Sequence, residues 1–195
     1  MRSFESIKKA LKGRLTAERL DHSLRVGELA AQLSPIYGEN PEQAYLAGLL
    51  HDIAKELELP AIKQMLNGSN GQLDPDYCDG LYLHAPAGAI VAEKEFGIKE
   101  PRFLEAVRYH TGLYFLGEAS LLTQTLCIAD YVENMHPLPQ KGWVMRLALD
   151  GKLDSAMHQW CMSVMRYYLS KGLSIHPNLV ASWLYFGRRG PAQLP

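Results

Sequence analysis

The chain has 195 residues, of which 47% are hydrophobic, and this combination predicts one domain with a sizeable core. Its 20 Lys and Arg residues nearly balance its 21 Asp and Glu residues, which gives a net charge of -1. This balance argues against a protein that binds nucleic-acid polymers or anionic membranes, and it leaves open a small anionic ligand in a local pocket.

The cysteines and the N-terminal sequence help to predict the cellular compartment of the protein. Three widely spaced cysteines without a CxxC pair argue against a disulfide framework or a Cys-rich zinc site. Residues 1–11 form a charged amphipathic stretch rather than a signal peptide, and no apolar run approaches the ~18–20 residues of a membrane span. We therefore expect a soluble, cytoplasmic protein without a membrane or nucleic-acid partner, and the sequence leaves its oligomeric state open.

The first half of the chain is predicted to be helical, because its apolar residues recur with a period near 3.6. We expect helices over residues 15–33, 41–55 and 60–66, with proline marking the start of the second. A stretch rich in Gly, Asn and Asp at 67–80 is predicted to be the longest loop, and a helix over 85–96 follows it.

The second half continues the same pattern. Helices are expected over residues 101–110, 118–134, 143–149 and 177–187. An amphipathic helix between the last two carries an apolar stripe of Met157, Trp160, Cys161, Val164, Met165 and Tyr168. We therefore predict an all-α fold of eight to ten helices. It forms a single domain over the whole chain, 1–195, with its core at about 15–185 and a frayed tail at 188–195.

Ionisable residues stand on the apolar faces of several predicted helices. His51 shares a face with apolar residues at helical spacing, with Asp52 beside it, and His110 and Asp130 occupy the same kind of position. His22 lies in the middle of its helix. Burying an unpaired carboxylate or imidazolium is costly, and a divalent metal would remove this cost because imidazoles and carboxylates are its ligands.

Each of these residues also has an ordinary explanation. A single histidine on an apolar face is more often a hydrogen-bonded core residue than a ligand, and a buried aspartate is more often a cap or half of an ion pair. Four helices that each place His or Asp inward are harder to explain separately, because facing helices can deliver ligands to one centre. The adjacent His51-Asp52 pair is the sharpest feature, since neighbouring ligands can bind one ion or bridge two.

Five sequence blocks in a fixed order carry a family resemblance. They are LDHSLRVGELAAQLSPIYG, AYLAGLLHDIAKE, LHAPAGAIVAEKEFGI, AVRYHTG and IADYVE, and KGLSIHPNLV follows them near the C-terminus. Their order resembles the HD superfamily of metal phosphohydrolases, with HDIAK at 51–55 as its eponymous motif. It resembles still more closely the YqeK-type branch, the symmetrical diadenosine tetraphosphate (Ap4A) hydrolases. The resemblance covers about residues 15–185 and implies an all-α HD-domain helical bundle.

The resemblance implies a centre of two divalent or transition-metal ions, usually iron, with manganese, zinc or magnesium as alternatives. The ligands that it implies are His22, His51, Asp52 and Asp130 for one ion, and His84 and His110 for the other, with Asp52 bridging. On its own, His84 fits a surface position near a helix start equally well. The implied activity is cleavage of Ap4A into two ADP by a hydroxide that the metals generate.

A few further residues are candidates for contact with the nucleotide substrate. Lys55 lies one helical turn after the His-Asp pair and is predicted to be a phosphate clamp and, with Asp52, a catalytic residue. Arg25 is a second predicted clamp, and a solvated surface charge explains either residue nearly as well. Thr111 and Gly112 are predicted to line the nucleotide pocket, although Gly112 also fits a helix end.

The chain departs from the family pattern at three places where an arginine is usual. The replacements are Leu113 after the HTG block, ENMHP at 133–137, and Ala181-Ser182-Trp183 in the C-terminal block. Two alternatives therefore stay open: an HD hydrolase of another nucleotide, such as a dNTP or NMP, and a low-turnover nucleotide-binding sensor. The remaining histidines match no ligand position and are interpreted as structural or surface residues: His136, His158 and His176.

Overall fold

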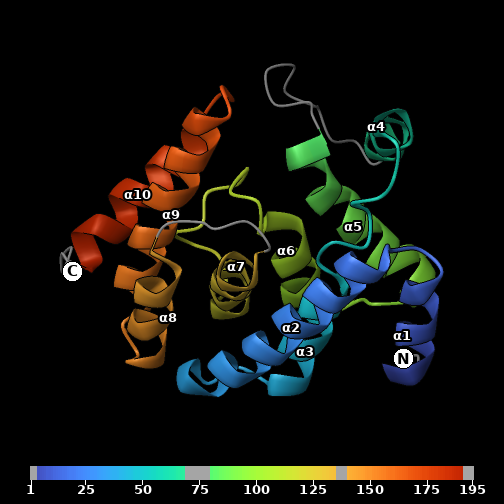
Figure 1. Ribbon diagram of the computed structural model, residues 1–195, viewed down its shortest axis with the longest axis horizontal. Helices are drawn as coiled ribbons and strands as arrows, with labels where there is room; N and C mark the ends of the chain where they lie inside the picture. Colours follow the sequence, from blue (N-terminus) through green and yellow to red (C-terminus); the bar gives the residue numbers. More distant parts are fainter. Residues whose placement is uncertain (1–3, 69–79, 135–139, 191–195) are drawn as a thin grey trace.

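The computed structural model describes residues 4–68, 80–134 and 140–190, which fold into α-helices joined by turns (Figure 1). Within these residues there are ten α-helices, one 3₁₀ helix and no strand, which confirms the predicted all-α fold. In chain order the elements are α1 (Phe4–Lys12), α2 (Ala17–Leu33), η1 (Ser34–Tyr37), α3 (Pro41–Leu50), α4 (Leu59–Asn67), α5 (Gly80–Phe96), α6 (Pro101–Tyr109), α7 (Leu121–Glu133), α8 (Lys141–Leu149), α9 (Leu153–Ser170) and α10 (Pro177–Arg189).

Helix starts follow the capping residues of the sequence. The Asn40 side chain accepts hydrogen bonds from two backbone N–H groups at the start of α3, where Pro41 occupies the first turn. The Ser120 hydroxyl accepts a hydrogen bond from the first turn of α7, so this helix begins at Leu121 and not near residue 118. Prolines also open α6 and α10, as predicted.

The second predicted helix is shorter than expected. α3 ends at Leu50, and residues 51–56 continue as turns closed by hydrogen bonds between residues three apart. The His51 ring takes part in ending the helix, because its Nδ1 lies 2.7 Å from the carbonyl oxygen of Gly48. The predicted helical stripe that continues past His51 is therefore wrong, and tight turns carry the residues that follow.

The helix that carries His84 begins earlier than predicted. α5 starts at Gly80 and not near residue 85, so Pro86 lies inside the helix and His84 in its second turn. A proline inside a helix costs about 3 kcal/mol. Tyr82 and Leu83, just before it, are only 2% and 3% exposed, and we attribute the early start to the burial of these side chains.

Both predicted flexible segments lie mainly outside the described residues. Residues 69–79 of the predicted loop are among those that the structure does not describe, as are residues 191–195 of the predicted tail. α10 reaches Arg189, two residues beyond its predicted end at 187. Of the helices that the structure does describe, none is long and apolar enough to cross a membrane.

The helices α2, which carries His22, and α3, which His51 and Asp52 follow, cross at close distance. A Cβ atom on Gly48 would lie 2.5 Å from the Cα atom of Gly27, so the crossing requires glycine. Figure 1 shows these two helices together on one side of α7, with α8, α9 and α10 on its other side. α7 packs against both α2 and α9, and it therefore links the two sides of the molecule.

Candidate metal centre

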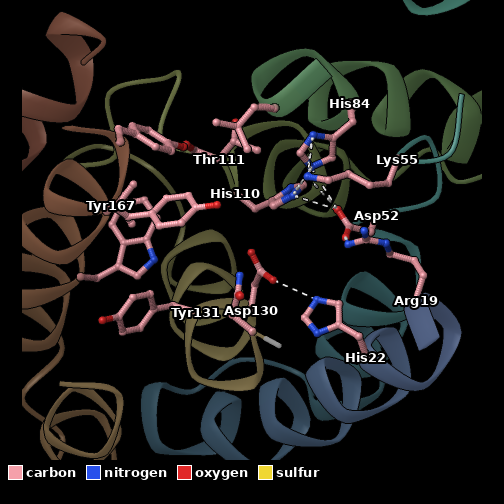
Figure 2. Close-up of a pocket in the computed structure, with 15 residues that line it drawn as sticks. Arg19, His22, Asp52, Lys55, His84, His110, Thr111, Asp130, Tyr131 and Tyr167 are labelled. Carbon is pink, nitrogen blue, oxygen red and sulfur yellow. Dashed lines mark hydrogen bonds and ion pairs between the residues drawn. The ribbon is translucent and has the colours of Figure 1, made fainter. Parts of the chain in front are cut away.

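Six ionisable side chains from different parts of the fold come together: five of them line one end of a pocket (Figure 2), and the sixth, His51, is fully buried beside them. They are His22 from α2, His51 and Asp52 from the turns after α3, His84 from α5, His110 just after α6, and Asp130 from α7. The four histidines and Asp52 are at most 3% exposed, and Asp130 is half-buried. The structure therefore brings together all six residues that were predicted as ligands.

The first group of donor atoms surrounds Asp130. Its Oδ1 lies 3.1 Å from Nε2 of His22 and 3.4 Å from Nε2 of His51. The three residues place one donor atom each within 4.8 Å of the others, an arrangement that could hold a metal ion. Two imidazole nitrogens and one carboxylate oxygen suit a transition metal better than magnesium.

The second group surrounds Asp52, whose two oxygens face different histidines. Oδ2 lies 3.6 Å from Nε2 of His51, whereas Oδ1 lies 3.0 Å from Nε2 of His84 and 3.8 Å from Nε2 of His110. The Nε2 atoms of His84 and His110 are 3.1 Å apart. His51, Asp52 and His110 also place donor atoms within 4.8 Å of one another, so His51 belongs to both groups.

Backbone carbonyl groups fix the orientation of three of the rings. The Nδ1 atoms of His22, His51 and His110 lie 3.2, 2.7 and 2.8 Å from backbone carbonyl oxygens. A carbonyl oxygen only accepts hydrogen bonds, so each Nδ1 carries the hydrogen and donates it. The Nε2 lone pair of the neutral ring then faces the centre, as it does in most histidines that ligate a metal.

The carboxylates and histidines of the centre shift one another's pKa. Burial lowers the pKa of His51, but the Asp52 and Asp130 carboxylates outweigh this effect and raise it to about 9. Burial favours the neutral form of both carboxyl groups, yet the nearby histidines, and for Asp52 also Lys55, hold their pKa values well below the usual range. Burial and the Lys55 ammonium lower the pKa of His84 to about 4. The ring of His84 is therefore neutral beside the ionised Asp52 carboxylate.

One buried nitrogen shows that the residues present fit a cation. His51 is 0% exposed, and its Nε2 lies 3.4 and 3.6 Å from the carboxylate oxygens of Asp130 and Asp52 without forming a hydrogen bond of normal geometry to any residue that the structure describes. A buried polar atom without a hydrogen-bond partner is costly, and native proteins contain few of them. A metal ion bound at this nitrogen would displace the ring proton, take up the lone pair that is freed and offset the charge of the two carboxylates.

Two basic side chains reach the Asp52 carboxylate from the pocket. Lys55 Nζ lies 3.1 Å from Nε2 of His84 and 4.0 Å from Oδ1 of Asp52. Arg19 Nη1 lies 2.9 Å from Oδ2 of Asp52, and both basic residues line the pocket. Our sequence analysis missed Arg19, although its position three residues before His22 places the two on one face of α2.

The other predicted contact residues lie in different surroundings. Arg25 forms ion pairs with Asp21 and Glu133 and is not among the residues that line the pocket. Thr111 does line it, and its Oγ1 is buried without a hydrogen-bond partner among the described residues. Gly112 has a φ of 79° in the turn after α6 and is not a lining residue, so its position fits the helix-end role.

The opposite wall of the pocket is aromatic and comes mainly from one helix. Trp160, Val164, Tyr167 and Tyr168 of α9 line it, and we call these four residues the α9 wall. Three of them belong to the predicted apolar stripe, to which the sequence analysis gave no place in the site. Tyr167 lies outside that stripe, and Figure 2 shows it reaching across the pocket toward His110.

The histidines that were not predicted as ligands lie away from the centre. His158 stacks on Trp183, with ring centroids 5.5 Å apart. His176 caps α10, where its Nδ1 accepts a hydrogen bond from the backbone N–H of Asn178. These contacts agree with the structural role predicted for both residues, and His136 lies outside the described residues.

Comparison with known protein families and relatives supports the family resemblance that the sequence indicated. The HD domain family matches residues 19–135. Three relatives carry the name symmetrical bis(5'-nucleosyl)-tetraphosphatase. That of Halalkalibacterium halodurans is 30% identical over 89% of this chain and 91% of its own length. Those of Staphylococcus aureus and Bacillus subtilis are 28% and 29% identical, and the alignments cover 94% and 91% of this chain and 94% and 95% of theirs.

A solved structure extends the likeness to the whole fold. The structure is that of a predicted HD superfamily hydrolase involved in NAD metabolism from Clostridium acetobutylicum. It superposes on this chain with a TM-score of 0.88 at 30% sequence identity, over 97% of this chain and 99% of the other. The sequence matches and the superposition therefore both relate this chain to HD-domain proteins.

Proposed function

The chain belongs to the HD-domain family, in its branch of symmetrical bis(5'-nucleosyl)-tetraphosphatases, and on this premise we propose that it is a metal-dependent phosphohydrolase that cleaves Ap4A into two ADP. The observation that carries the proposal is the cluster of four histidines and two aspartates, five of which line one end of a pocket. Relatives named for this activity match the chain over nearly their whole length.

Metal binding is the first element of the proposal, and divalent metal binding is a property of HD domains. We propose that His22, His51, Asp52 and Asp130 would hold one ion, and that His84 and His110, together with Asp52, would hold a second. This assignment is supported by Asp52, whose two oxygens face different histidines. We propose iron, because the histidine-rich donor set favours a transition metal and the family resemblance implies iron. A bound divalent ion supplies Lewis-acid neutralisation of phosphate charge.

Phosphate binding is assigned to Lys55 and Arg19. Their nitrogens lie 4.0 and 2.9 Å from the two oxygens of Asp52, so a phosphate that approaches the centre meets positive charge on both sides of this carboxylate. Arg19 takes the place of Arg25 in our assignment, because Arg25 pairs with two carboxylates outside the pocket lining. A guanidinium can bind a phosphate bidentately, whereas the Lys55 ammonium acts as a point charge.

The reaction adds one water across the central phosphoanhydride bond of Ap4A. The water oxygen forms a bond to phosphorus, the bond from that phosphorus to the bridging oxygen breaks, and the leaving ADP keeps the electron pair. The side chains serve by holding the phosphates in line and by offsetting negative charge. We assign to Lys55 the role of offsetting negative charge on the phosphates. We assign to Thr111 Oγ1, which is buried without a hydrogen-bond partner among the described residues, a hydrogen bond to the substrate.

Product analysis tests this proposal. Protein purified without oxygen is assayed for metal content and incubated with Ap4A, and the products are separated by anion-exchange chromatography. We expect ADP alone. AMP together with ATP would contradict symmetrical cleavage, and faster turnover of a dNTP or NMP would favour another nucleotide as the substrate. Tight nucleotide binding without turnover in metal-replete protein would favour the sensor.

A further inference from the structure

We propose that Tyr167 is a specificity-determining residue that stacks on a nucleobase of the substrate, so that the pocket selects nucleotides over phosphoanhydrides without a base. This inference rests on the proposed function, because it takes a nucleotide as the occupant of the pocket. It assigns a role to the α9 wall, which neither the metal ligands nor the phosphate clamps explain.

The two sides of the pocket differ in the chemistry that they offer. One side carries the imidazoles and carboxylates of the centre with Lys55 and Arg19, which are groups for cations and phosphates. The α9 wall consists of two tyrosines, a tryptophan and a valine. Aromatic side chains bind flat ring systems by stacking, and such stacking tolerates any base because every base has a π-face. A nucleotide matches both sides, since it joins a phosphate chain to an aromatic base.

Tyr167 is the aromatic residue of the α9 wall that is open to a ligand. Trp160 and Tyr168 are only 2% and 5% exposed, whereas Tyr167 is half-buried. Figure 2 shows its side chain extending from α9 across the pocket toward His110. The buried Trp160 and Tyr168 therefore form the backing of the wall, and Tyr167 offers its surface.

Contacts around Tyr167 hold the wall at a fixed place relative to the centre. The Lys171 ammonium lies 5.8 Å from the centroid of the Tyr167 ring, and the Tyr168 ring lies 6.0 Å from it at 53°. The Tyr168 hydroxyl donates a 2.9 Å hydrogen bond to the backbone carbonyl of Thr111, the residue after His110. A stacking surface that is already in place loses little freedom when a base binds, which favours affinity.

The test compares a ligand that has a base with one that lacks it. Binding of ADP and of inorganic pyrophosphate to metal-loaded protein is measured by calorimetry for the wild type, Tyr167→Leu and Tyr167→Phe. Tyr185→Leu on α10 is the matched control, because Tyr185 is also a half-buried tyrosine and is not among the residues that line this pocket. Stacking on one base is worth about 5- to 100-fold in affinity. We therefore expect Tyr167→Leu to weaken ADP binding by about tenfold or more without changing pyrophosphate binding.

The conservative variant separates the ring from its hydroxyl. Tyr167→Phe keeps the stacking surface, so it should bind ADP within about twofold of the wild type. Equal losses for ADP and pyrophosphate in Tyr167→Leu would show a merely structural role and overturn the inference. So would unchanged ADP binding, or a loss in Tyr167→Phe as large as in Tyr167→Leu.

Two further readouts keep the inference falsifiable. The wild type should bind ADP at least about tenfold more tightly than pyrophosphate, and equal affinities would contradict the stacking role even if Tyr167→Leu failed to fold. Ap4A turnover is measured on the same samples. If Ap4A is not hydrolysed but ADP is still preferred over pyrophosphate in a way that depends on Tyr167, the proposed function alone is contradicted. If kcat/KM for Ap4A is equal in the wild type and Tyr167→Leu, the inference alone is contradicted.

Discussion

The two walls of the pocket are built in opposite ways. The side of the centre, which we call the ligand wall, gathers the six predicted ligands from distant parts of the chain, and backbone carbonyl groups hold the Nδ1 atoms of three of its four histidines. The α9 wall comes from consecutive turns of one helix and is fixed mainly by packing. Ionisable groups break the apolar pattern of a helix, whereas aromatic groups conform to it. The first wall is therefore visible in the sequence and the second is not.

The largest expected effect comes from removing the carboxylate at the middle of the ligand wall. Asp52→Ala takes away the oxygens that lie between the two donor groups, so we expect loss of bound metal and a fall in Ap4A turnover of about 10³-fold or more. Elemental analysis and kcat/KM measure the two effects. Asp154→Ala, which removes a surface partner of Arg189, is the control and should change neither. Full metal content and activity in Asp52→Ala would refute the assignment of this residue.

The next effect separates two arginines of α2. Arg19 contacts Asp52 and lines the pocket, whereas Arg25 pairs with Asp21 and Glu133. We expect Arg19→Ala to lower kcat/KM by about 10- to 100-fold, the usual worth of a charged hydrogen bond, and Arg25→Ala to change it by less than about twofold. Steady-state kinetics with Ap4A measure both. Equal losses of kcat/KM in the two variants would support the phosphate-binding role that the sequence predicted for Arg25.

Particular residues show how much of the site could be predicted from the sequence. His51, His110 and Asp130 were predicted because each occupies a place where an apolar side chain is expected, and Asp52 because it adjoins His51. His84 needed the family resemblance, and its helix begins at Gly80, before the start that was predicted near residue 85. The remaining errors share a cause, because local patterns do not show which charges or aromatic rings meet in space.

Two residues illustrate this limit. Arg19 lies near a helix start, where an arginine fits a solvated surface charge, and only the fold brings it to within 2.9 Å of Asp52. Tyr167 falls beside the apolar stripe of its helix, and nothing in its local pattern indicates that it reaches the pocket. Both positions depend on the packing of distant helices, which the periodicity of one segment cannot predict.

A smaller effect should come from the scaffold behind the ligand wall. Gly48→Ala would place a Cβ atom 2.5 Å from the Cα atom of Gly27 and force α2 and α3 apart. We expect it to lower the free energy of unfolding by about 1–3 kcal/mol, measured by denaturant titration. Gly142→Ala in α8 is the matched control, since its Cβ would meet no atom within 4 Å. An equal stability of the two variants would contradict the close crossing.

The smallest expected effect is a pH dependence of metal affinity. Because the pKa of His51 is raised to about 9, its ring is protonated at neutral pH in the metal-free protein, and a metal must displace that proton. Affinity should therefore fall as the pH falls below about 9, by about tenfold per pH unit. Metal titrations between about pH 6.5 and 8.5 measure this slope. An affinity that stays constant over this range would contradict a protonated His51.

The most direct test of the account is anomalous diffraction from crystals of protein purified without oxygen and loaded with iron. We predict anomalous density among the Nε2 atoms of His22, His51 and His110 and the carboxylates of Asp52 and Asp130, across the pocket from Tyr167. Metal-replete crystals with no density at this place, or with these side chains turned to different partners, would contradict the central claim.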